Sequence, residues 1–407
     1  MLDRLTIERM LAWTGDKPVL VALSGGGDSV ALLHLLVAEL GAARLHVAIV
    51  DHALRGRSAD DATRALSFAK ALGVDAKVLT LSWADGSNRA QQAAREARYR
   101  AICDYARGEE LNTIVAAHTA DDQAETVLMR GANGSTWRGL AGVAPFAFAP
   151  LWPEGRGIAL ARPLLSARRE RLRTYLRDQR GTWIEDPANT NPKFERVRVR
   201  ARLADLETSG FDPMRLVSLA GRLRQRSDAL DTAASELIGR AVNIGNDIVI
   251  ANAKWSAPCD VRCRALSVLM AAAAGSDREP PWTEMEAVER RVMSADHRGS
   301  THSGVEFRSD RSGPKLLRER GAVLGRADGA QPLAPLPLTA NVEAIWDGRL
   351  AVTVSEDGWR IVPARNNEFF AFENNQVGDA KPNARLRPLA AERVVHAFAP
   401  DINRAKP

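Results

Sequence analysis

The chain has 407 residues, enough for two or three domains with hydrophobic cores of their own. Hydrophobic residues make up 45% and charged residues 26%, and no run of eighteen apolar residues occurs, which excludes an ordinary membrane-spanning helix. The N-terminus lacks the apolar core of a signal peptide. The three cysteines, Cys103, Cys259 and Cys263, are too few for a disulfide framework, so we expect a cytoplasmic protein.

The formal net charge of +6 is concentrated in one stretch. Between Arg162 and Arg202 lie twelve basic and five acidic residues, an excess of seven that is larger than the excess of the whole chain. Such a stretch is typical of a contact with a nucleic-acid backbone. Most charge runs, however, are solvated helix faces, and charge alone does not decide between the two.

The first half of the chain alternates between predicted strands and helices. Apolar runs predict strands at 19–23, 45–50, 74–81 and 113–117. Helical spacing predicts helices at 28–40, 58–72, 88–107 and 120–130. Elements of this length in this order predict an α/β fold, a doubly wound parallel sheet that binds its ligands at the carboxyl ends of the strands.

A glycine-rich turn, Ser24-Gly25-Gly26-Gly27-Asp28-Ser29, joins the first strand to its helix. Three glycines let the backbone adopt conformations closed to other residues and let a ligand approach the main chain. The turn's N–H groups and the helix dipole then favour an anion, most simply phosphate. Because Asp28 would repel a phosphate unless a cation lay between them, the turn also predicts Mg²⁺. A Walker loop and a dinucleotide fingerprint are excluded, since the first needs a lysine and the second a further glycine.

A second polar segment follows the fourth predicted strand, at the same edge of the sheet. It contains His118, Asp121, Asp122, Gln123 and Glu125. Asp122 and Glu125 are three residues apart and share one face of the helix that begins here. A helix cap explains one carboxylate but not several, so this segment predicts a site for a metal ion and a cationic group.

Three further segments complete a pattern that covers residues 18–203. Val50-Asp51-His52-Ala53-Leu54-Arg55 follows the second strand, and Ala94-Arg95-Glu96-Ala97-Arg98-Tyr99-Arg100 follows Asn88. A last segment contains Asp186-Pro187, Asn189, Phe194, Arg196 and Arg200. With the glycine-rich turn and the His118–Thr126 segment, this series closely resembles the tRNA(Ile)-lysidine synthetase family of the ATP pyrophosphatase, or PP-loop, superfamily, whose fold is adenine nucleotide α-hydrolase-like.

The resemblance implies an ATP-dependent ligase. Members of the family join L-lysine to carbon 2 of the wobble cytidine of tRNA(Ile) with anticodon CAU, through an adenylated tRNA intermediate, and cleave ATP to AMP and pyrophosphate. The resemblance further implies which residues carry this chemistry. ATP would bind Ser24, Gly25, Gly26, Gly27, Asp28 and Ser29; Mg²⁺ would bind Asp28 and Asp122; lysine would bind Asp122 and Glu125; and tRNA would bind Arg95, Arg196 and Arg200. Asp28, Asp122, Glu125 and Arg196 would be the catalytic residues.

Each of these arginines has a structural alternative. Arg196 and Arg200 are four residues apart and share a helix edge, where they would either meet tRNA phosphates or pair with Asp186 or Glu195. A basic helix is predicted just upstream, beginning after Ser166 as its N-cap and ending at Gly181.

The second half of the chain gives weaker signals. We expect an ATP-binding catalytic domain over 1–210, a mainly helical tRNA-binding domain over 211–328, and a linker with a short mixed α/β tail over 329–407. Helices are predicted at 216–238 and 261–274, a proline-rich linker at 330–340, and strands at 342–346, 350–354 and 359–363. Asp347-Gly348 is a favoured pair for a hairpin turn between the first two of these strands.

Two other functions share some of these features. A tRNA thiolation enzyme of the same superfamily would share the ATP loop, but such enzymes generally need a Cys-x-x-Cys pair, which this chain lacks. A non-catalytic RNA-binding relative would not need Asp28, Asp122 and Glu125. The sequence leaves the oligomeric state open, a homodimer included.

Overall fold

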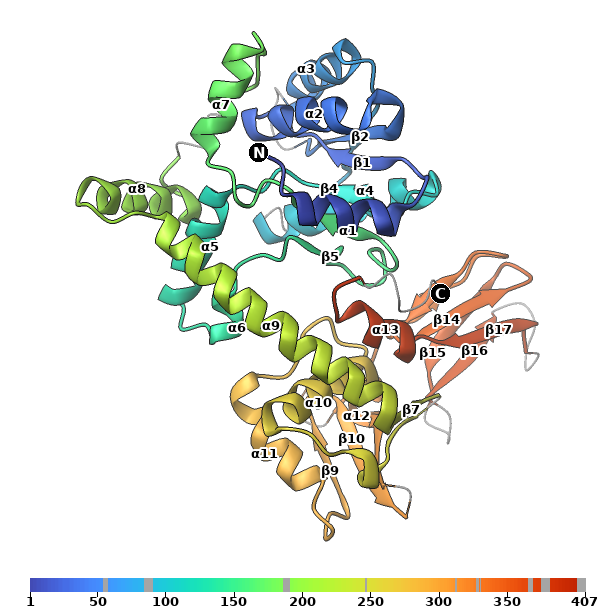
Figure 1. Cartoon of the computed structure of the whole chain (residues 1–407). Helices are drawn as coiled ribbons and strands as arrows, with labels where there is room; N and C mark the ends of the chain where they lie inside the picture. Colours follow the sequence, from blue (N-terminus) through green and yellow to red (C-terminus); the bar gives the residue numbers. More distant parts are fainter. Residues whose placement is uncertain are drawn as a thin grey trace. The chain divides into compact units, whose positions relative to one another are not determined.

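The computed structural model describes residues 1–53, 58–83, 91–185, 191–245, 247–311, 313–326, 329, 331–364, 369–374 and 381–400. The chain forms two compact units, Met1–Ser227 with the C-terminal residues from Ala399, and Asp228–Phe398 (Figure 1). Helix α9, Met214–Ala241, runs through the boundary between them. The domain boundaries expected at 210 and 328 stay predictions. Within the described ranges, no helix is both long and apolar enough to cross a membrane.

A six-stranded sheet forms the centre of the first unit. Its strands are β1 (Val19–Ala22), β2 (Leu45–Asp51), β3 (Asp75–Thr80), β4 (Thr113–Val115), β5 (Phe146–Phe148) and β6 (Ala159–Ala161). They lie in the order β3-β2-β1-β4-β6-β5, and every neighbouring pair is parallel except β5 and β6. The predicted parallel sheet is confirmed, with β5 added as an antiparallel edge strand.

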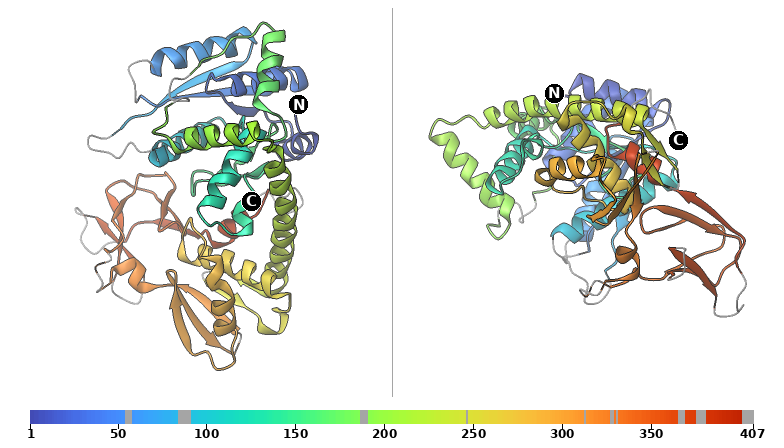
Figure 2. Two further views of the ribbon diagram at one scale, coloured as in Figure 1. Left: turned by 90° about the vertical axis from the view of Figure 1, so that its left-hand side faces the viewer. Right: turned by 90° about the horizontal axis from the view of Figure 1, so that it is seen from below.

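Helices cover both faces of this sheet, as a doubly wound fold requires. The helices of this unit that precede α9 are α1 (Arg4–Thr14), α2 (Gly27–Leu40), α3 (Ser58–Ala71), α4 (Gln91–Gly108), α5 (Ala120–Ala132), α6 (Trp137–Leu140), α7 (Arg169–Asp178) and α8 (Glu195–Thr208). Successive strand residues point to opposite faces. Val21 therefore packs into the core that contains α1, α2, α3 and α7 residues, while Leu20 packs into the core that contains α4. α5 packs against α8 within the same unit (Figure 2).

The basic helix α7 begins later than the sequence predicts. It begins at Arg169, with Arg168 at the N-cap position, and ends at Asp178, so Ser166 is not its cap. The backbone N–H of Arg169 instead donates to Oδ2 of Asp121 at 2.7 Å. A carboxylate from α5 thus caps α7, and a partner 48 residues away leaves no local sequence signal.

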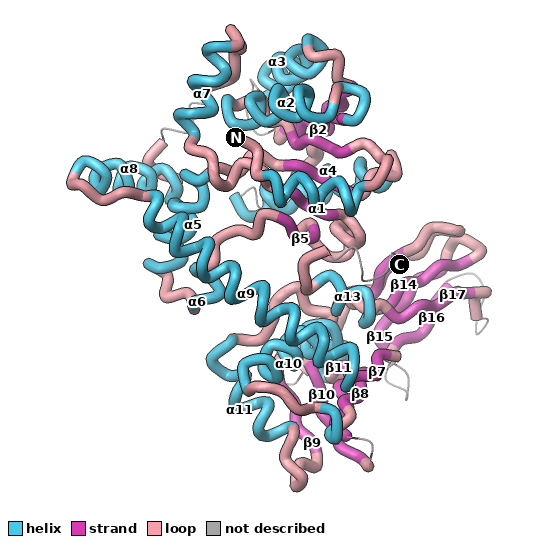
Figure 3. Tube along the Cα trace, in the orientation of Figure 1, coloured by secondary structure: helices cyan, strands magenta, loops and turns pink. Residues whose placement is uncertain are grey.

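The second unit contains the predicted helices and a sheet that the sequence did not reveal. α9, α10 (Cys259–Ala274) and α11 (Trp282–Val292) confirm the helical character of this region. They accompany a five-stranded sheet in the order β7-β8-β11-β10-β9 (Figure 3). The strands are β7 (Val242–Ile244), β8 (Ile248–Ile250), β9 (Gly299–His302), β10 (Val305–Asp310) and β11 (Gly313–Arg318). The region is therefore mainly helical, as predicted, and the sheet is an addition to that prediction.

The predicted hairpin of the tail is present. β13 (Ala344–Trp346) pairs antiparallel with β14 (Leu350–Val354), and Asp347 and Gly348 take φ angles of 52° and 62° in the turn. The expected linker at 330–340 contributes β12 (Leu336–Pro337), which pairs with β15, so it is more than a linker. The remaining elements are α12 (Arg320–Leu324), β15 (Trp359–Pro363), β16 (Phe370–Asn374), β17 (Ala384–Pro388) and α13 (Ala390–His396).

The buried thiol of Cys103 on α4 generates a first prediction. Burial raises the pKa of Cys103 to about 12, so at pH 8 only about one molecule in ten thousand carries the reactive thiolate. We expect iodoacetamide at pH 8 to leave Cys103 unmodified in the folded protein and to alkylate it fully after denaturation, as read by peptide mass spectrometry. Cys259, which is exposed, is the internal control. Equal rates at Cys103 and Cys259 in the folded protein would contradict the prediction.

Candidate active site

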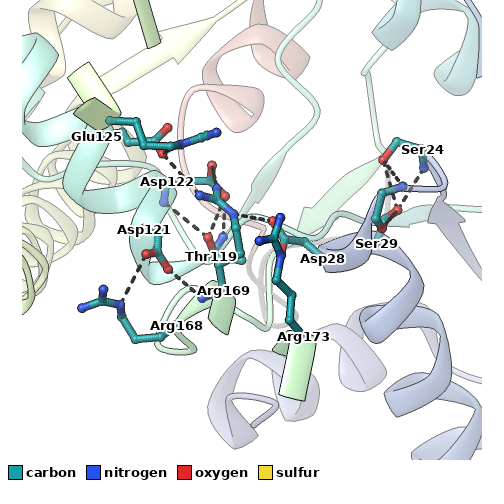
Figure 4. Close-up of polar contacts among 12 residues, drawn as sticks. Ser24, Asp28, Ser29, Thr119, Asp121, Asp122, Glu125, Arg168, Arg169 and Arg173 are labelled. Carbon is teal, nitrogen blue, oxygen red and sulfur yellow. Dashed lines mark hydrogen bonds and ion pairs between the residues drawn. The ribbon is translucent and has the colours of Figure 1, made fainter. Parts of the chain in front are cut away.

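The glycine-rich turn lies between the carboxyl end of β1 and the N-terminus of α2. The hydroxyl oxygens of Ser24 and Ser29 are 3.1 Å apart (Figure 4). Ser29 Oγ also accepts from the backbone N–H of Ser24 at 3.2 Å and donates to the carbonyl of Gly26 at 2.9 Å. Ser29 thereby closes the turn, and the first N–H groups of α2 lie beside it, an arrangement suited to an anion.

The three glycines of the turn differ in why they are needed. Gly25 has a φ of +80°, which other residues rarely adopt, and a Cβ there would lie 2.5 Å from Cδ1 of Ile184. Gly26 and Gly27 have no such constraint. A Cβ on Gly26 would meet nothing closer than Ser24 Oγ at 3.6 Å, and one on Gly27 would touch the Trp183 ring at 3.5 Å. Of the three glycines, Gly25 is the one that adopts a conformation closed to other residues, and at Gly26 the missing side chain leaves room for a ligand.

One guanidinium joins the three carboxylates that the sequence singles out. Arg169 Nε lies 3.0 Å from Asp28 Oδ2, and its Nη2 lies 3.1 Å from Asp122 Oδ1 (Figure 4). Its Nη1 lies 3.6 Å from Glu125 Oε1. Asp28 at the start of α2 and the two acids of α5 therefore converge on one position, as predicted. The cation that they share was not predicted.

Thr119 fixes the orientation of Asp122. As the N-cap residue of α5, it donates from its backbone N–H to Asp122 Oδ2 at 2.8 Å and from its hydroxyl at 2.9 Å. Asp122 N donates back to Thr119 Oγ1, which completes a capping box. Asp122 therefore both caps α5 and belongs to the acidic site, two roles that were alternatives when only the sequence was considered.

The site drives the pKa values of its two aspartates in opposite directions. Burial raises the pKa of Asp28, and the charge of Arg169 offsets only part of that effect. Burial also acts to raise the pKa of Asp122, but the charge of Arg169 and the hydrogen bonds from Thr119 outweigh it and hold the pKa below its usual value. Burial acts to lower the pKa of Arg169, yet Asp122 and Asp28 raise it, so the guanidinium stays charged.

Two buried carboxylate oxygens of the site have no hydrogen-bond partner among the residues described. They are Oδ1 of Asp28 and Oε2 of Glu125. Glu125 is only 1% exposed. Buried hydrogen-bond acceptors in folded proteins nearly always have a partner. Each of these oxygens therefore indicates a ligand that donates a hydrogen bond or carries positive charge.

Arg200 and Arg196 have different surroundings although they share α8. Arg200 Nε lies 2.9 Å from Glu125 Oε1, and Asp186, the other partner that the sequence offered, lies outside the described residues. Arg196 is exposed. Burial lowers the pKa of Arg98, and the positive charges of Arg95 and Arg196 lower it further. Arg95, Arg98 and Arg196 therefore lie in one positively charged region. Of the two predicted α8 arginines, only Arg200 belongs to the acidic site.

His118 is buried, and the charge of Arg162 acts on its ring. Burial and the charge of Arg162 lower its pKa to about 3, so the imidazole is neutral at physiological pH. Its Nδ1 is buried and has no hydrogen-bond partner in the described part of the chain. The charge of Asp122 acts in the opposite direction on the His118 ring, so His118 is close to the acidic site as well as to Arg162.

Arg169 is the site residue that the sequence analysis missed. It lies in the basic stretch from Arg162 to Arg202, for which charge alone left a nucleic-acid contact and a solvated helix face as alternatives. The sequence did contain a signal, because three acids on one helix need a cation to offset their charge. Many basic residues of the chain could supply that cation, however, and the sequence does not distinguish among them. Arg55, Asn88 and Asn189 of the family pattern fall outside the described ranges.

Comparison with known proteins agrees with this geometry. Residues 3–207 match the PP-loop domain family. A tRNA(Ile)-lysidine synthase from Hyphomonas neptunium is 37% identical over 311 residues, covering 75% of this chain and 83% of the relative. Another, from Mesorhizobium japonicum, is 36% identical over 82% of this chain and 72% of the relative. A solved U34-tRNA thiolase, NcsA from Methanococcus maripaludis, is more distant, at 16% identity and a TM-score of 0.44 over 54% of this chain and 77% of that chain. The chain belongs to the tRNA(Ile)-lysidine synthase family of PP-loop proteins.

Proposed function

We propose that this protein ligates L-lysine to carbon 2 of the wobble cytidine of tRNA(Ile) with anticodon CAU, using ATP and Mg²⁺. The observation that supports this most is the convergence of Asp28, Asp122 and Glu125 beside the loop 24–29. A phosphate site, a pair of carboxylates for a divalent cation and a carboxylate for an ammonium group then lie within one site.

The reaction has two steps whose bonds balance. The oxygen on carbon 2 attacks the α-phosphorus of ATP, the α–β phosphoanhydride breaks, and pyrophosphate leaves. The ε-amine of lysine then attacks carbon 2, the carbon–oxygen bond breaks, AMP leaves, and the amine gives up a proton. The loop supplies backbone N–H groups, the hydroxyls of Ser24 and Ser29 and the dipole of α2, all of which bind phosphate and stabilise its charge.

Mg²⁺ fits the residues that the sequence assigns to it. Magnesium is usually held by one or two carboxylates together with water and substrate phosphates. Asp28 and Asp122 supply two, and Asp28 Oδ1 is a buried oxygen with no hydrogen-bond partner among the described residues. When bound, Mg²⁺ would offset the charge of departing pyrophosphate.

The tRNA would approach along the region of Arg95 and Arg196. Both side chains act on the guanidinium of Arg98 and lower its pKa, so they lie close to it. Arg95 also lies over the ring of Tyr99, with 5.0 Å from its guanidinium carbon to the ring centroid. An arginine held over an aromatic face beside an exposed arginine suits a nucleotide and its phosphate.

The thiolation alternative gains no support from the cysteines. Cys103 is buried in the core of the first unit, and burial raises its pKa to about 12, as it does for Cys263. Neither thiol has the low pKa of a sulfur carrier. A decisive assay combines purified protein, ATP, lysine and total tRNA and searches the nucleosides for lysidine by mass spectrometry. Absence of lysidine, with or without a thiolated product, would refute the proposed function.

Asp28→Asn tests the metal assignment. The substitution removes the carboxylate charge but keeps its shape, so we expect formation of adenylated tRNA to fall by at least about 100-fold, the scale of losing one electrostatic contact in a reacting site. Binding of tRNA, measured by filter retention, should change less than about twofold. Asp60→Asn, at an exposed position of α3, is the matched control and should retain full activity. Weak tRNA binding with normal AMP transfer would instead place Asp28 at the tRNA.

Replacing Arg95 and Arg196 together with Ala tests the tRNA surface. If each contacts a phosphate, the slope of log affinity against log salt should become shallower by about one unit per lost contact. Arg64→Ala, an exposed arginine on α3, should leave the slope unchanged. A double variant with a lower melting temperature and an unaltered slope would show that both arginines are structural.

A further inference from the structure

Two of the three cysteines lie together at the start of α10, in the second unit. The sulfur atoms of Cys259 and Cys263 are 3.8 Å apart, within the distance of a hydrogen bond between thiols. Cys259 is the first residue of the helix and is exposed. Cys263 lies one helical turn further along and is only 3% exposed. Solvent therefore reaches one thiol of the pair, while the protein covers the other.

A positive charge lies beside both sulfur atoms. Arg262 Nε is 2.6 Å from Glu289 Oε1 on α11, which packs against α10. The hydrogen bond to Glu289 raises the pKa of Arg262. Thiolate charge on either cysteine raises it further, so the guanidinium lies near both sulfurs. This charge and the positive end of the α10 dipole favour negative charge on sulfur, and the thiolate is the form of cysteine that oxidants attack.

We propose that Cys259 and Cys263 form a modification site, at which a hydroperoxide converts the two thiols into a reversible disulfide. In the first step the Cys259 thiolate attacks the peroxide, and the O–O bond breaks. A sulfenic acid forms, and the remaining oxygen takes up a proton and leaves as an alcohol or water. In the second step the Cys263 sulfur attacks the sulfenic sulfur, the S–O bond breaks, and water leaves with the thiol proton. The two sulfurs together give two electrons to the peroxide.

Burial sets the order of the two steps. It raises the pKa of Cys263 to about 12, and the hydrogen bond and charge of Cys259 add to the effect. Cys263 is therefore a protonated, covered thiol while Cys259 is reduced. When Cys259 becomes a neutral sulfenic acid, its negative charge no longer acts on Cys263. An exposed sulfenic acid with a second thiol beside it is the usual precursor of a disulfide.

The place of the pair at the helix start allows the bond to close. Residues four apart on a helix have Cβ atoms about 5–6 Å apart. A disulfide needs about 3.5–4.5 Å, so the turn that carries the pair must tighten. Cys259 is well placed for this change, because the first N–H groups of a helix have no partner within it and Pro258 before it is extended. A pair in the middle of a helix would have to break backbone hydrogen bonds on both sides.

Peptide mapping of the oxidised full-length protein provides the test. The fully reduced protein is treated with hydrogen peroxide at neutral pH, blocked with N-ethylmaleimide and digested with trypsin. Because trypsin cleaves after Arg262, a disulfide between Cys259 and Cys263 joins peptide 255–262 to peptide 263–264. We expect this joined species to be the main product and the intact monomer to be lighter by two hydrogens. Dithiothreitol should restore both thiols.

Three single variants separate the steps. Cys263→Ser should stop at the sulfenic acid of Cys259, which dimedone traps. Cys259→Ser should leave Cys263 reduced, because that thiol is buried. Cys103→Ala removes the third thiol of the chain and should give the same joined peptide as the wild type. A melting curve of each variant before oxidation shows that it is folded.

Three results would overturn the inference. The first is oxidation of Cys259 to a sulfinic acid, or to a disulfide between two chains, while Cys263 stays reduced. The second is a joined peptide that forms only when the protein is partly denatured. The third is retention of both thiols after peroxide treatment. None of these measurements uses the activity of the protein, so the inference stands or falls separately from the proposed function.

Discussion

The guanidinium of Arg169 is the contact on which the geometry of the site depends. Three carboxylates from α2 and α5 lie close enough to share it, and two of them keep a buried oxygen that no described residue hydrogen-bonds. Like charges this close repel and would push at least one acid to take up a proton. A fixed cation among them lets them stay near one another and ionised. Because Asp121 also caps α7, the helix that carries the cation is held by the helix that carries the acids.

The pairing of the three acids with Arg169 also determines how the site can bind a charged ligand. Each ligand proposed for the acids, Mg²⁺ or an ammonium group, is itself a cation. Binding therefore exchanges one positive partner for another, or shares the carboxylates between two, and the acids are never left uncompensated in a low-dielectric site. The raised pKa of Asp28 and the lowered pKa of Asp122 show that the compensation is uneven. Asp28 gains most from an added cation, which agrees with its place beside the phosphate loop.

Local patterns predicted the parts of this site that lie on single elements. The glycine-rich turn after β1 and the spacing of Asp122 and Glu125 on α5 are visible in a few consecutive residues, and alternating strands and helices predicted the parallel sheet. Arg169 could not be found in this way, since its contact with Asp28 joins residues 141 positions apart. The sheet β7–β11 was missed because strands such as β9, with the sequence Gly-Ser-Thr-His, lack the apolar alternation that marks a strand.

The basic stretch from Arg162 to Arg202 shows that a count of charges cannot assign a role to an arginine until its contacts in the fold are known. Its excess of seven was weighed as one surface, yet Arg168, Arg169 and Arg200 each pair with an acid of α5, which lies outside that stretch. Three of its charges are thus used within the protein, where they orient carboxylates. On our proposal, exposed arginines such as Arg196 are the ones left to contact tRNA. Whether an arginine binds a phosphate or orients the residues of a site depends on the side chain that it contacts. The position of an arginine in the sequence does not reveal that contact.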